Sequence, residues 1–252
     1  MIEVLDIPLY DLGMKQAVQD VIKVCKDDLD KKNRCISATG AHGLVIAKKN
    51  SDFADLLKNF YFNLPDGRPA VVIGKIKGAK NIEQCTGPDF FKNIMEATST
   101  YDIKHYLCGG KAGIAEELKL NCEKRFFNKN IVGIYSPPFK PMTNDELRML
   151  GNEINSKLVD ILWIGISTPK QEFFAKEMSQ FINVHFIITV GAAFDFHTDK
   201  IRRAPRFIQR MGMEWFFRLC IEPRRLWKRY LEIVPKFIYY NLTELFTKNK
   251  SI

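Results

Sequence analysis

Asp66 is the residue in this sequence best suited to act as a general base. It lies in the segment Pro65-Asp66-Gly67, within an expected tight loop at 64–69. A carboxylate on a rigid loop can take a proton from a substrate hydroxyl. The same segment is also a common turn signal, because aspartate caps its own turn and glycine accepts a positive φ angle. Taken alone, it favours a turn, so other motifs must support catalysis.

Ser37 and Thr39 provide hydroxyl groups earlier in the chain. A short strand is expected at 34–37, followed by a turn at 39–43. Isolated hydroxyls at such corners are usually only polar corner residues. The sequence does not decide whether Thr39 or Ser37 would serve an active site.

The segment Val159 to Glu172 predicts a buried strand, a turn and the start of a helix. Its apolar half is typical of a parallel strand that is covered on both faces. Thr168 is expected as the N-cap and Pro169 as the first helical residue, with Gln171 three positions after the cap. The turn would then lie at the carboxyl end of a strand, where open α/β sheets bind ligands and helix N-termini face anions.

Glycines at 109–113 form a second candidate anion site, between an expected strand at 105–108 and an expected helix. Gly109 and Gly110 would let the backbone approach a phosphate closely. The pattern is neither Gly-x-Gly-x-x-Gly nor a P-loop, which argues against NAD and ATP. A plain glycine corner is an equally open alternative.

The histidines and cysteines do not suggest a metal site. The four histidines lack the spacing of metal ligands, and the six cysteines are scattered without a Cys-x-x-Cys pair. Scattered cysteines argue against a disulfide scaffold and fit a reducing cytosol.

Expected strands alternate with expected helices through most of the chain. Further strands are expected at 70–73, 131–135 and 185–190, and further helices at 44–49, 52–60, 87–97 and 143–157. Such alternation predicts βαβ units and a parallel sheet. We therefore expect an α/β fold, a Rossmann-like, mostly parallel sheet with flanking helices, over residues 1–200.

Residues 201–252 differ in composition and are expected to form a basic helical appendage. They hold 12 Lys+Arg and 4 Asp+Glu residues, and so carry +8 of the net charge of +9. Pro205, Pro223 and Pro235 would divide them into short helices. Basic side chains interleaved with Trp, Phe and Tyr suit an anionic membrane surface. Nucleic acid, a partner protein, or simple packing of the helices on their own domain are the alternatives.

The sequence shows neither a signal peptide nor a membrane-spanning segment. The first residues lack a basic stretch followed by an apolar run, and no stretch approaches the ~20 apolar residues of a spanning helix. We therefore expect a protein that is soluble or lies on a membrane.

Together these motifs resemble the WecG/TagA/CpsF family of bacterial glycosyltransferases. Each matching segment is weak evidence by itself, but many occur in the same order over most of the chain. They are Pro65-Asp66-Gly67, Gly87-Pro88-Asp89, Gly109-Gly110, Pro169-Lys170-Gln171-Glu172, Gly191 to Phe196, Arg203-Ala204-Pro205, Gly212-Met213-Glu214-Trp215, Arg218-Leu219, Glu222-Pro223-Arg224-Arg225 and Arg229-Tyr230.

The resemblance implies an inverting glycosyltransferase that uses no metal ion or other cofactor. It would move a sugar, as an N-acetylmannosaminyltransferase does, from a UDP-sugar to a saccharide on a polyprenyl diphosphate. The product would feed a surface polymer such as teichoic acid, capsule or exopolysaccharide. The enzyme would be cytoplasmic and peripheral on the inner face of the cell membrane, without a nucleic-acid partner. A homo-oligomer is left open.

The resemblance also implies roles for individual residues. Asp66 would deprotonate the acceptor hydroxyl, with Thr39 beside it in the catalytic site. Donor binding would involve Gly109, Gly110, Lys170, Gln171, Glu172 and Asp195. The lipid diphosphate and the membrane would be met by Arg203, Arg218, Arg224, Arg225 and Arg229. Many members carry an arginine where this chain has Gln84, so one cation near the diphosphates is missing here.

Two other functions fit the same residues. A non-catalytic basic protein would use the appendage on nucleic acid and would have no need of Asp66. A sugar-phosphate or nucleoside hydrolase on the same α/β body would be indifferent to lipid.

Overall fold

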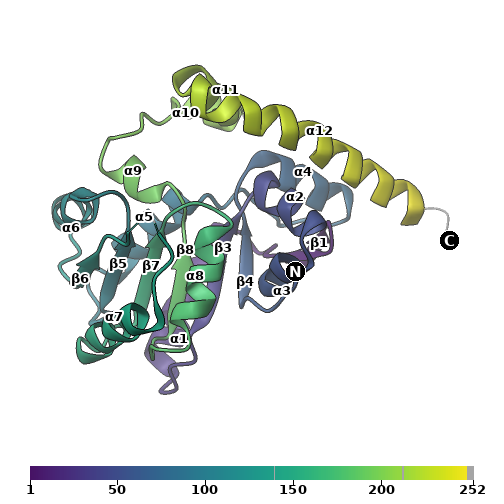
Figure 1. Ribbon diagram of the computed structural model, residues 1–252. Helices are drawn as coiled ribbons and strands as arrows, with labels where there is room; N and C mark the ends of the chain where they lie inside the picture. Colours follow the sequence, from purple (N-terminus) through teal and green to yellow (C-terminus); the bar gives the residue numbers. More distant parts are fainter. Residues whose placement is uncertain (139, 212, 249–252) are drawn as a thin grey trace.

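The computed structural model describes residues 1–138, 140–211 and 213–248, apart from the side chains of Arg206, Arg210, Arg225 and Lys248. The described chain forms one eight-stranded sheet between two layers of helices (Figure 1). Its strands are β1 (Ile2–Val4), β2 (Ile7–Leu9), β3 (Arg34–Thr39), β4 (Phe62–Pro65), β5 (His105–Gly109), β6 (Ile131–Tyr135), β7 (Ile161–Gly165) and β8 (Phe186–Thr189).

The strand order is β1-β2-β4-β3-β8-β7-β5-β6, and the only antiparallel neighbours in the described sheet are β1 and β2. The expected α/β fold with a mostly parallel sheet is therefore confirmed. The order places the carboxyl ends of β4, β3, β8 and β7 next to one another. Loops that follow these four strands meet at one edge of the sheet.

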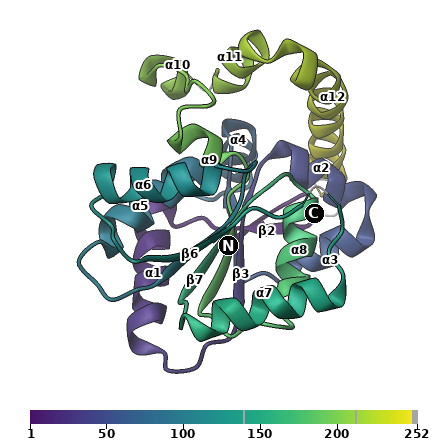
Figure 2. The same ribbon diagram turned by 60° about the vertical axis from the view of Figure 1, so that its left-hand side comes forward.

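Each face of the sheet is covered by its own set of helices (Figure 2). The first set is α1 (Gly13–Asp27), α5 (Gly87–Thr98), α6 (Ile114–Arg125) and α9 (Ala193–His197). The second set is α2 (Ala41–Lys49), α3 (Ser51–Lys58), α7 (Asn144–Ser156) and α8 (Lys170–Met178). Side chains of β7 alternate between the two cores, with Ile161 and Trp163 in one and Leu162 and Ile164 in the other. This accounts for the unbroken apolar run of β7.

The prediction of a strand at 70–73 is wrong, because this stretch belongs to helix α4 (Arg68–Ile76). Its β-branched residues suggest a strand, but Ala70, Val71 and Gly74 lie on one buried helical face. The nearby sheet position is taken by β4, within a segment expected to be mainly loop. The short hairpin of β1 and β2 was also not predicted.

The predicted start of α8 is wrong by one residue. Pro169 is the N-cap, and no side chain caps this helix. The hydroxyl of Thr168 is instead engaged by the side chains of Gln171 and Glu172.

The C-terminal segment forms α10 (Arg206–Arg210), α11 (Glu214–Ile221) and α12 (Pro223–Lys248). Helix α12 crosses above α2 and α4 (Figure 1) and buries Ile233 and Phe237 in the same core as α2. Pro235 lies inside α12, so the prediction that it ends a helix is wrong. An interior proline removes one backbone hydrogen bond, and burial of its neighbours on both sides offsets this cost.

Candidate active site

Asp66 and Thr39 lie side by side where β4 and β3 end. Thr39 is opposite Pro65 in the parallel ladder, and the backbone N–H of Asp66 donates to the carbonyl oxygen of Thr39 at 3.1 Å. The next residue, Gly40, packs tightly on this loop, because a Cβ atom there would lie 2.3 Å from the carbonyl oxygen of Asp66. The backbone on both sides of Asp66 is therefore fixed by contacts with β3.

The carboxyl group of Asp66 has the proton affinity of a general base that works near neutral pH. Burial and the carboxylates of Glu214 and Asp89 raise the pKa of Asp66 to about 7, against the opposing influence of Arg218 and the N–H of Gly87. A base with a pKa near the working pH is the most effective in proton transfer. Glu214 belongs to the appendage, and the sequence alone gave no sign that it would lie near Asp66.

Behind Thr39, a chain of hydrogen bonds runs into the protein. The hydroxyl of Thr39 donates to Ser37 Oγ at 2.9 Å, and the hydroxyl of Ser37 donates to Glu172 Oε1 at 3.0 Å. Thr39 is 3 % exposed and Ser37 is fully buried. Of the two hydroxyls that the sequence left open, Thr39 therefore lies nearer the strand end.

Glu172 also receives hydrogen bonds from the turn before α8 and from the first turn of α8 itself. Its Oε1 accepts from Thr168 Oγ1 at 3.1 Å and from Gln171 Nε2 at 2.8 Å. The Oε1 atom of Gln171 in turn accepts from the N–H of Gly191, after β8, at 3.0 Å. Only 1 % of Gln171 and of Glu172 is exposed. The structure thus places both side chains beneath the strand ends, and donor contact by either one stays a prediction.

The glycines at the end of β5 serve the packing of the sheet. The N–H of Gly110 donates to the carbonyl oxygen of Gly165 at 3.0 Å, and a Cβ atom on Gly109 would lie 2.5 Å from that same oxygen. Both residues have positive φ angles, 153° and 73°. A phosphate cradle at this corner stays a prediction, and the N–H of Gly110 is already engaged within the sheet.

Two further residues expected at the donor lie on neighbouring turns. Lys170 is exposed at the start of α8. Asp195 lies half-buried in α9, after the turn that follows β8. Both are on the edge of the sheet that carries Asp66.

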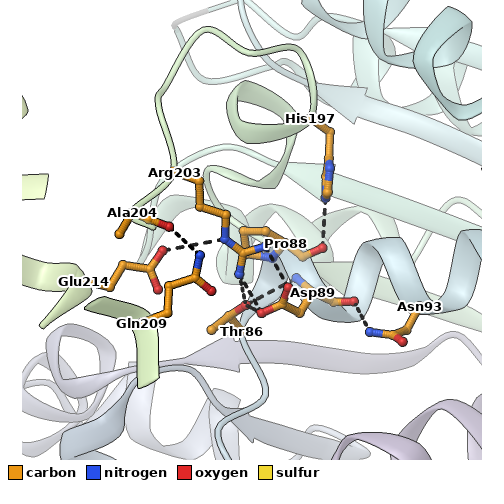
Figure 3. Close-up of polar contacts among 9 residues, drawn as sticks. All are labelled: Thr86, Pro88, Asp89, Asn93, His197, Arg203, Ala204, Gln209 and Glu214. Carbon is orange, nitrogen blue, oxygen red and sulfur yellow. Dashed lines mark hydrogen bonds and ion pairs between the residues drawn. The ribbon is translucent and has the colours of Figure 1, made fainter. Parts of the chain in front are cut away.

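Arg203 joins the appendage to the body of the protein (Figure 3). Its guanidinium donates to both carboxylate oxygens of Asp89, at 2.7 and 2.6 Å, and its Nε lies 3.7 Å from Glu214 Oε1. Asp89 is held in turn by Thr86, the N-cap of α5, whose Oγ1 accepts from the N–H of Asp89. Such a two-pronged pair is among the stronger ionic contacts in proteins. Contact of Arg203 with a lipid diphosphate stays a prediction.

The other arginines expected at the lipid diphosphate differ in their surroundings. Arg218 packs over the ring of Phe196, 5.2 Å from its centre, and lies 3.9 Å from Glu222. Arg224 is exposed, and Arg229 is half-buried beside Tyr230. Arg225 was expected in this group as well, but its side chain lies outside the described residues.

The appendage exposes many large apolar side chains. They are Phe207, Met211, Trp215, Phe216, Ile221, Trp227, Leu231, Val234, Ile238, Tyr239, Leu242 and Phe246. An exposed apolar patch of this kind marks an interaction surface. In the described parts of the chain, no helix combines the length and apolar character needed to cross a bilayer.

Comparison with known proteins identifies the family of this chain. The model of the glycosyl transferase WecG/TagA/CpsF family matches residues 2–251. The chain belongs to this family. It is also 27% identical over 226 residues to N-acetylglucosaminyldiphosphoundecaprenol N-acetyl-beta-D-mannosaminyltransferase from Bacillus subtilis (strain 168), covering 89% of this chain and 85% of that protein. The predicted resemblance is confirmed, and the protein is a glycosyltransferase.

In this WecG/TagA/CpsF glycosyltransferase, motifs that are far apart in the sequence lie close together in the structure. The Pro-Asp-Gly, Gly-Pro-Asp and Arg-Ala-Pro segments meet through Asp66, Asp89 and Arg203. Glu214 lies in a matching segment too, but it had been given no role. Its place in that matching segment was the only mark it carried in the sequence, and nothing there indicated that it would lie near Asp66.

Proposed function

We propose that this WecG/TagA/CpsF glycosyltransferase transfers a sugar from a UDP-sugar to a saccharide linked to a polyprenyl diphosphate. The observation that carries the proposal is Asp66, a half-buried carboxyl group at a strand end whose pKa is raised to about 7. A hydrolase would also use a base, but the basic, apolar appendage next to this carboxyl group favours a lipid-linked acceptor over water.

In the proposed reaction, an acceptor hydroxyl attacks the anomeric carbon of the donor while its proton passes to Asp66. The bond from that carbon to the UDP oxygen breaks on the opposite side, so the anomeric configuration inverts. Negative charge grows on the leaving diphosphate, and hydrogen-bond donors and cations must stabilise it. Lys170 on the exposed start of α8 and Arg218 beside Asp66 are the cations we assign to this role.

The relative from Bacillus subtilis is named for an acceptor on undecaprenyl diphosphate and for an N-acetyl-mannosaminyl donor group. We extend this chemistry to the present chain, which would then build a cell-surface polymer on the inner face of the cell membrane. The exposed Trp215, Trp227 and Tyr239 suit the interface of a bilayer, and the basic residues around them suit anionic head groups.

The test is sugar transfer from a panel of UDP-sugars to short-chain polyprenyl-diphosphate saccharides, with EDTA present. Asp66→Asn is run in parallel. The control is Asp102→Asn, which makes the same change at an exposed aspartate before β5. Loss of a positioned general base costs about 10²–10⁴-fold in rate. We expect a loss of this size in Asp66→Asn and none in Asp102→Asn. Equal activity of the two variants would remove Asp66 as the base.

A further inference from the structure

Two side chains on one face of helix α11 connect the appendage to the body of the protein. Glu214 and Arg218 are four positions apart, so they lie on the same side of the helix. Glu214 Oε1 lies 3.7 Å from Nε of Arg203, which binds Asp89 (Figure 3). The Arg218 guanidinium lies over the ring of Phe196 in α9, 5.2 Å from its centre. All residues of α11 are described and none is buried, so contacts of side-chain ends determine how this helix sits on the body.

Phe196 belongs to a helix that is firmly fixed in the core. In α9, Phe194 is 1 % exposed and packs on Phe91, with ring centres 6.0 Å apart. His197 stacks on the same Phe91 ring at 5.4 Å, and its Nε2 atom is 2.8 Å from the carbonyl oxygen of Pro88. Phe196 itself is only half-buried, so part of its ring stays accessible. The ring is therefore a fixed surface on which a long, flexible side chain can be placed.

The other described contacts of Arg218 do not tie its side chain to the body. Its ion pair with Glu222 spans 3.9 Å and joins two positions of the same helix end. Its Nε atom is buried and has no hydrogen-bond partner among the described residues. A guanidinium stacks well on an aromatic face, because its charge is attracted to the electrons of the ring. Among the contacts described, the one with Phe196 is therefore what sets the place of this guanidinium on the body.

The guanidinium of Arg218 is close enough to Asp66 to act on its charge. Asp66 accepts from the N–H of Gly87, the first residue of α5, so its carboxyl group lies on the side of the sheet that α5 and α9 cover. Burial raises the pKa of Asp66 to about 7, and Arg218 opposes this rise. The other charged or titratable groups that interact with Asp66 are Glu214, Asp89, Cys85 and Arg203.

We propose that Phe196 is a positioning residue whose ring holds the Arg218 guanidinium beside the Asp66 carboxyl group and the leaving diphosphate. This inference rests on the proposed function, in which Asp66 is the base and Arg218 stabilises the charge of the diphosphate. It adds that the appendage brings its cation to a surface already built into the body. Without the ring, the charge would remain on α11 but would no longer be fixed at the site.

The first arm of the test measures the ionisation of Asp66 directly, without turnover. The carbon NMR resonance of its carboxyl group is identified by its absence from Asp66→Asn and is followed as the pH is varied. Phe196→Leu removes the ring but keeps apolar bulk, so a less closely held Arg218 stabilises the carboxylate less. We expect the midpoint to rise by about 0.5 pH unit, part of the roughly 1–3 units that a close opposite charge supplies. Phe196→Tyr keeps the ring and should restore the wild-type midpoint.

The second arm measures sugar transfer at a pH above the midpoint, where Asp66 is ionised in every variant. We expect kcat to fall about tenfold in Phe196→Leu and to stay unchanged in Phe127→Leu, the same substitution at an exposed phenylalanine. Arg218→Met removes the charge but keeps a long side chain. In that background Phe196→Leu should cause no further loss, because a positioning residue acts only through the group that it positions.

A second variant tests the same contact if Phe196→Leu does not fold. Arg218→Lys keeps the charge but not the flat group that stacks on a ring, so it should raise the Asp66 midpoint in the same way.

Two results would overturn the inference. One is an unmoved Asp66 midpoint in Phe196→Leu, or in Arg218→Lys where that variant takes its place. The other is a loss of kcat in Phe196→Leu that adds in full to the loss in Arg218→Met, since the ring would then act on a substrate by itself. Failure of the proposed function looks different: Asp66→Asn would transfer sugar at the wild-type rate, while the raised midpoint in Phe196→Leu would still support the positioning of Arg218.

Discussion

The backbone N–H of Asp66 donates to the carbonyl oxygen of Thr39 at 3.1 Å, one step beyond the last paired residues of β3 and β4. Because of this bond, the hydrogen-bond pattern of the sheet continues into the loop that holds Asp66, the proposed general base. The loop is therefore an extension of a ladder and not an independent turn. Residues that pack on the bond should control the position of the carboxyl group without touching a substrate.

Gly40→Ala should impair transfer more than folding. Its new Cβ atom would lie 2.3 Å from the carbonyl oxygen of Asp66, so the loop must shift. We expect kcat to fall about 10²-fold, the effect of roughly 1 Å of misplacement, with an intact far-UV spectrum. Gly78→Ala is the control, because nothing lies within 4 Å of the added atom. The φ angle of Gly78 is positive, unlike that of Gly40 (−99°), so this control should lose some stability but no kcat. Equal kcat in both variants would contradict the prediction.

The pH profile should report the protonation of Asp66. The base works in its ionised form, and its pKa is raised to about 7. Transfer, measured as kcat/KM, should therefore rise with pH through about 7 and level off above it. In Asp66→Asn the residual rate should lose this dependence. A profile that is flat from pH 6 to pH 8 in the wild type, in the same assay, would refute the assignment.

Glu214→Gln should shift this profile to lower pH. Glu214 and Asp89 both raise the pKa of Asp66, whereas Arg218 lowers it, so removing one negative charge makes the carboxyl group more acidic. Cys85 and Arg203 also interact electrostatically with Asp66, whose charge raises the pKa of both groups. The matched control is Glu232→Gln on α12, where the carboxylate pairs with Lys49 and Lys236 on the surface. An unmoved midpoint in Glu214→Gln would show that the appendage does not tune the base.

Asp89→Asn should loosen the attachment of the appendage. The substitution removes the charge that holds both arms of the Arg203 guanidinium and leaves this side chain with Glu214 and the hydroxyl of Thr86. We expect faster amide hydrogen exchange at 202–221 and a lower Tm. Asp145→Asn tests the same change in the first turn of another helix, where no arginine whose side chain is described pairs with the aspartate. Similar exchange in the two variants would show that the pair contributes little.

His105 should make the protein sensitive to acid. It is fully buried, accepts from Trp163 Nε1 through Nδ1 at 3.1 Å and contacts Thr98 through Nε2, so it is neutral. Burial lowers its pKa to about 3, below the ~6.5 of an unfolded chain. The unfolded state therefore binds more protons, and stability that is complete above pH ~6.5 is lost as pH falls toward 3.

Urea unfolding between pH 7 and pH 4.5 measures this effect. Each such histidine contributes up to about 1.4 kcal/mol per pH unit to the slope. Burial also lowers the pKa of His42, His185 and His197, so His105→Gln should reduce the slope without abolishing it. An unchanged slope in His105→Gln would mean that this histidine is not buried neutral.

The sequence predicted those parts of the protein where local patterns and tertiary packing agree. The apolar run at β7 and the helix expected at 143–157, observed as α7, are examples. Asp66 was expected in a loop, but the strand β4 that leads into this loop was not. The strand predicted at 70–73 was wrong because three β-branched residues, which favour a strand, also fit into a helix. The helix end predicted at Pro235 was wrong because α12, which contains this proline, is stabilised by packing on α2.

The sequence named several residues that lie around Asp66, though not Glu214, but it did not predict how they are connected. No spacing in the chain shows that Glu172 lies under Ser37, which is 135 positions away. The same holds for Arg203 and Asp89, which are 114 positions apart. The first connection follows from strand order, which brings β3 next to β8 and β7 next to β8. The second follows from the packing of α5 against α9, the helix that precedes Arg203.

That strand order has a consequence for synthesis on the ribosome. β3 pairs with β8 through partners such as Arg34 and Phe186, so most of the chain must emerge before the two halves of the sheet can join. Until then a nascent chain presents β3 with an open edge and holds no complete catalytic constellation. Such long-range pairing is slow. A truncated translation product that ends before β8 would thus be both inactive and prone to aggregate, which makes full-length synthesis a condition of activity.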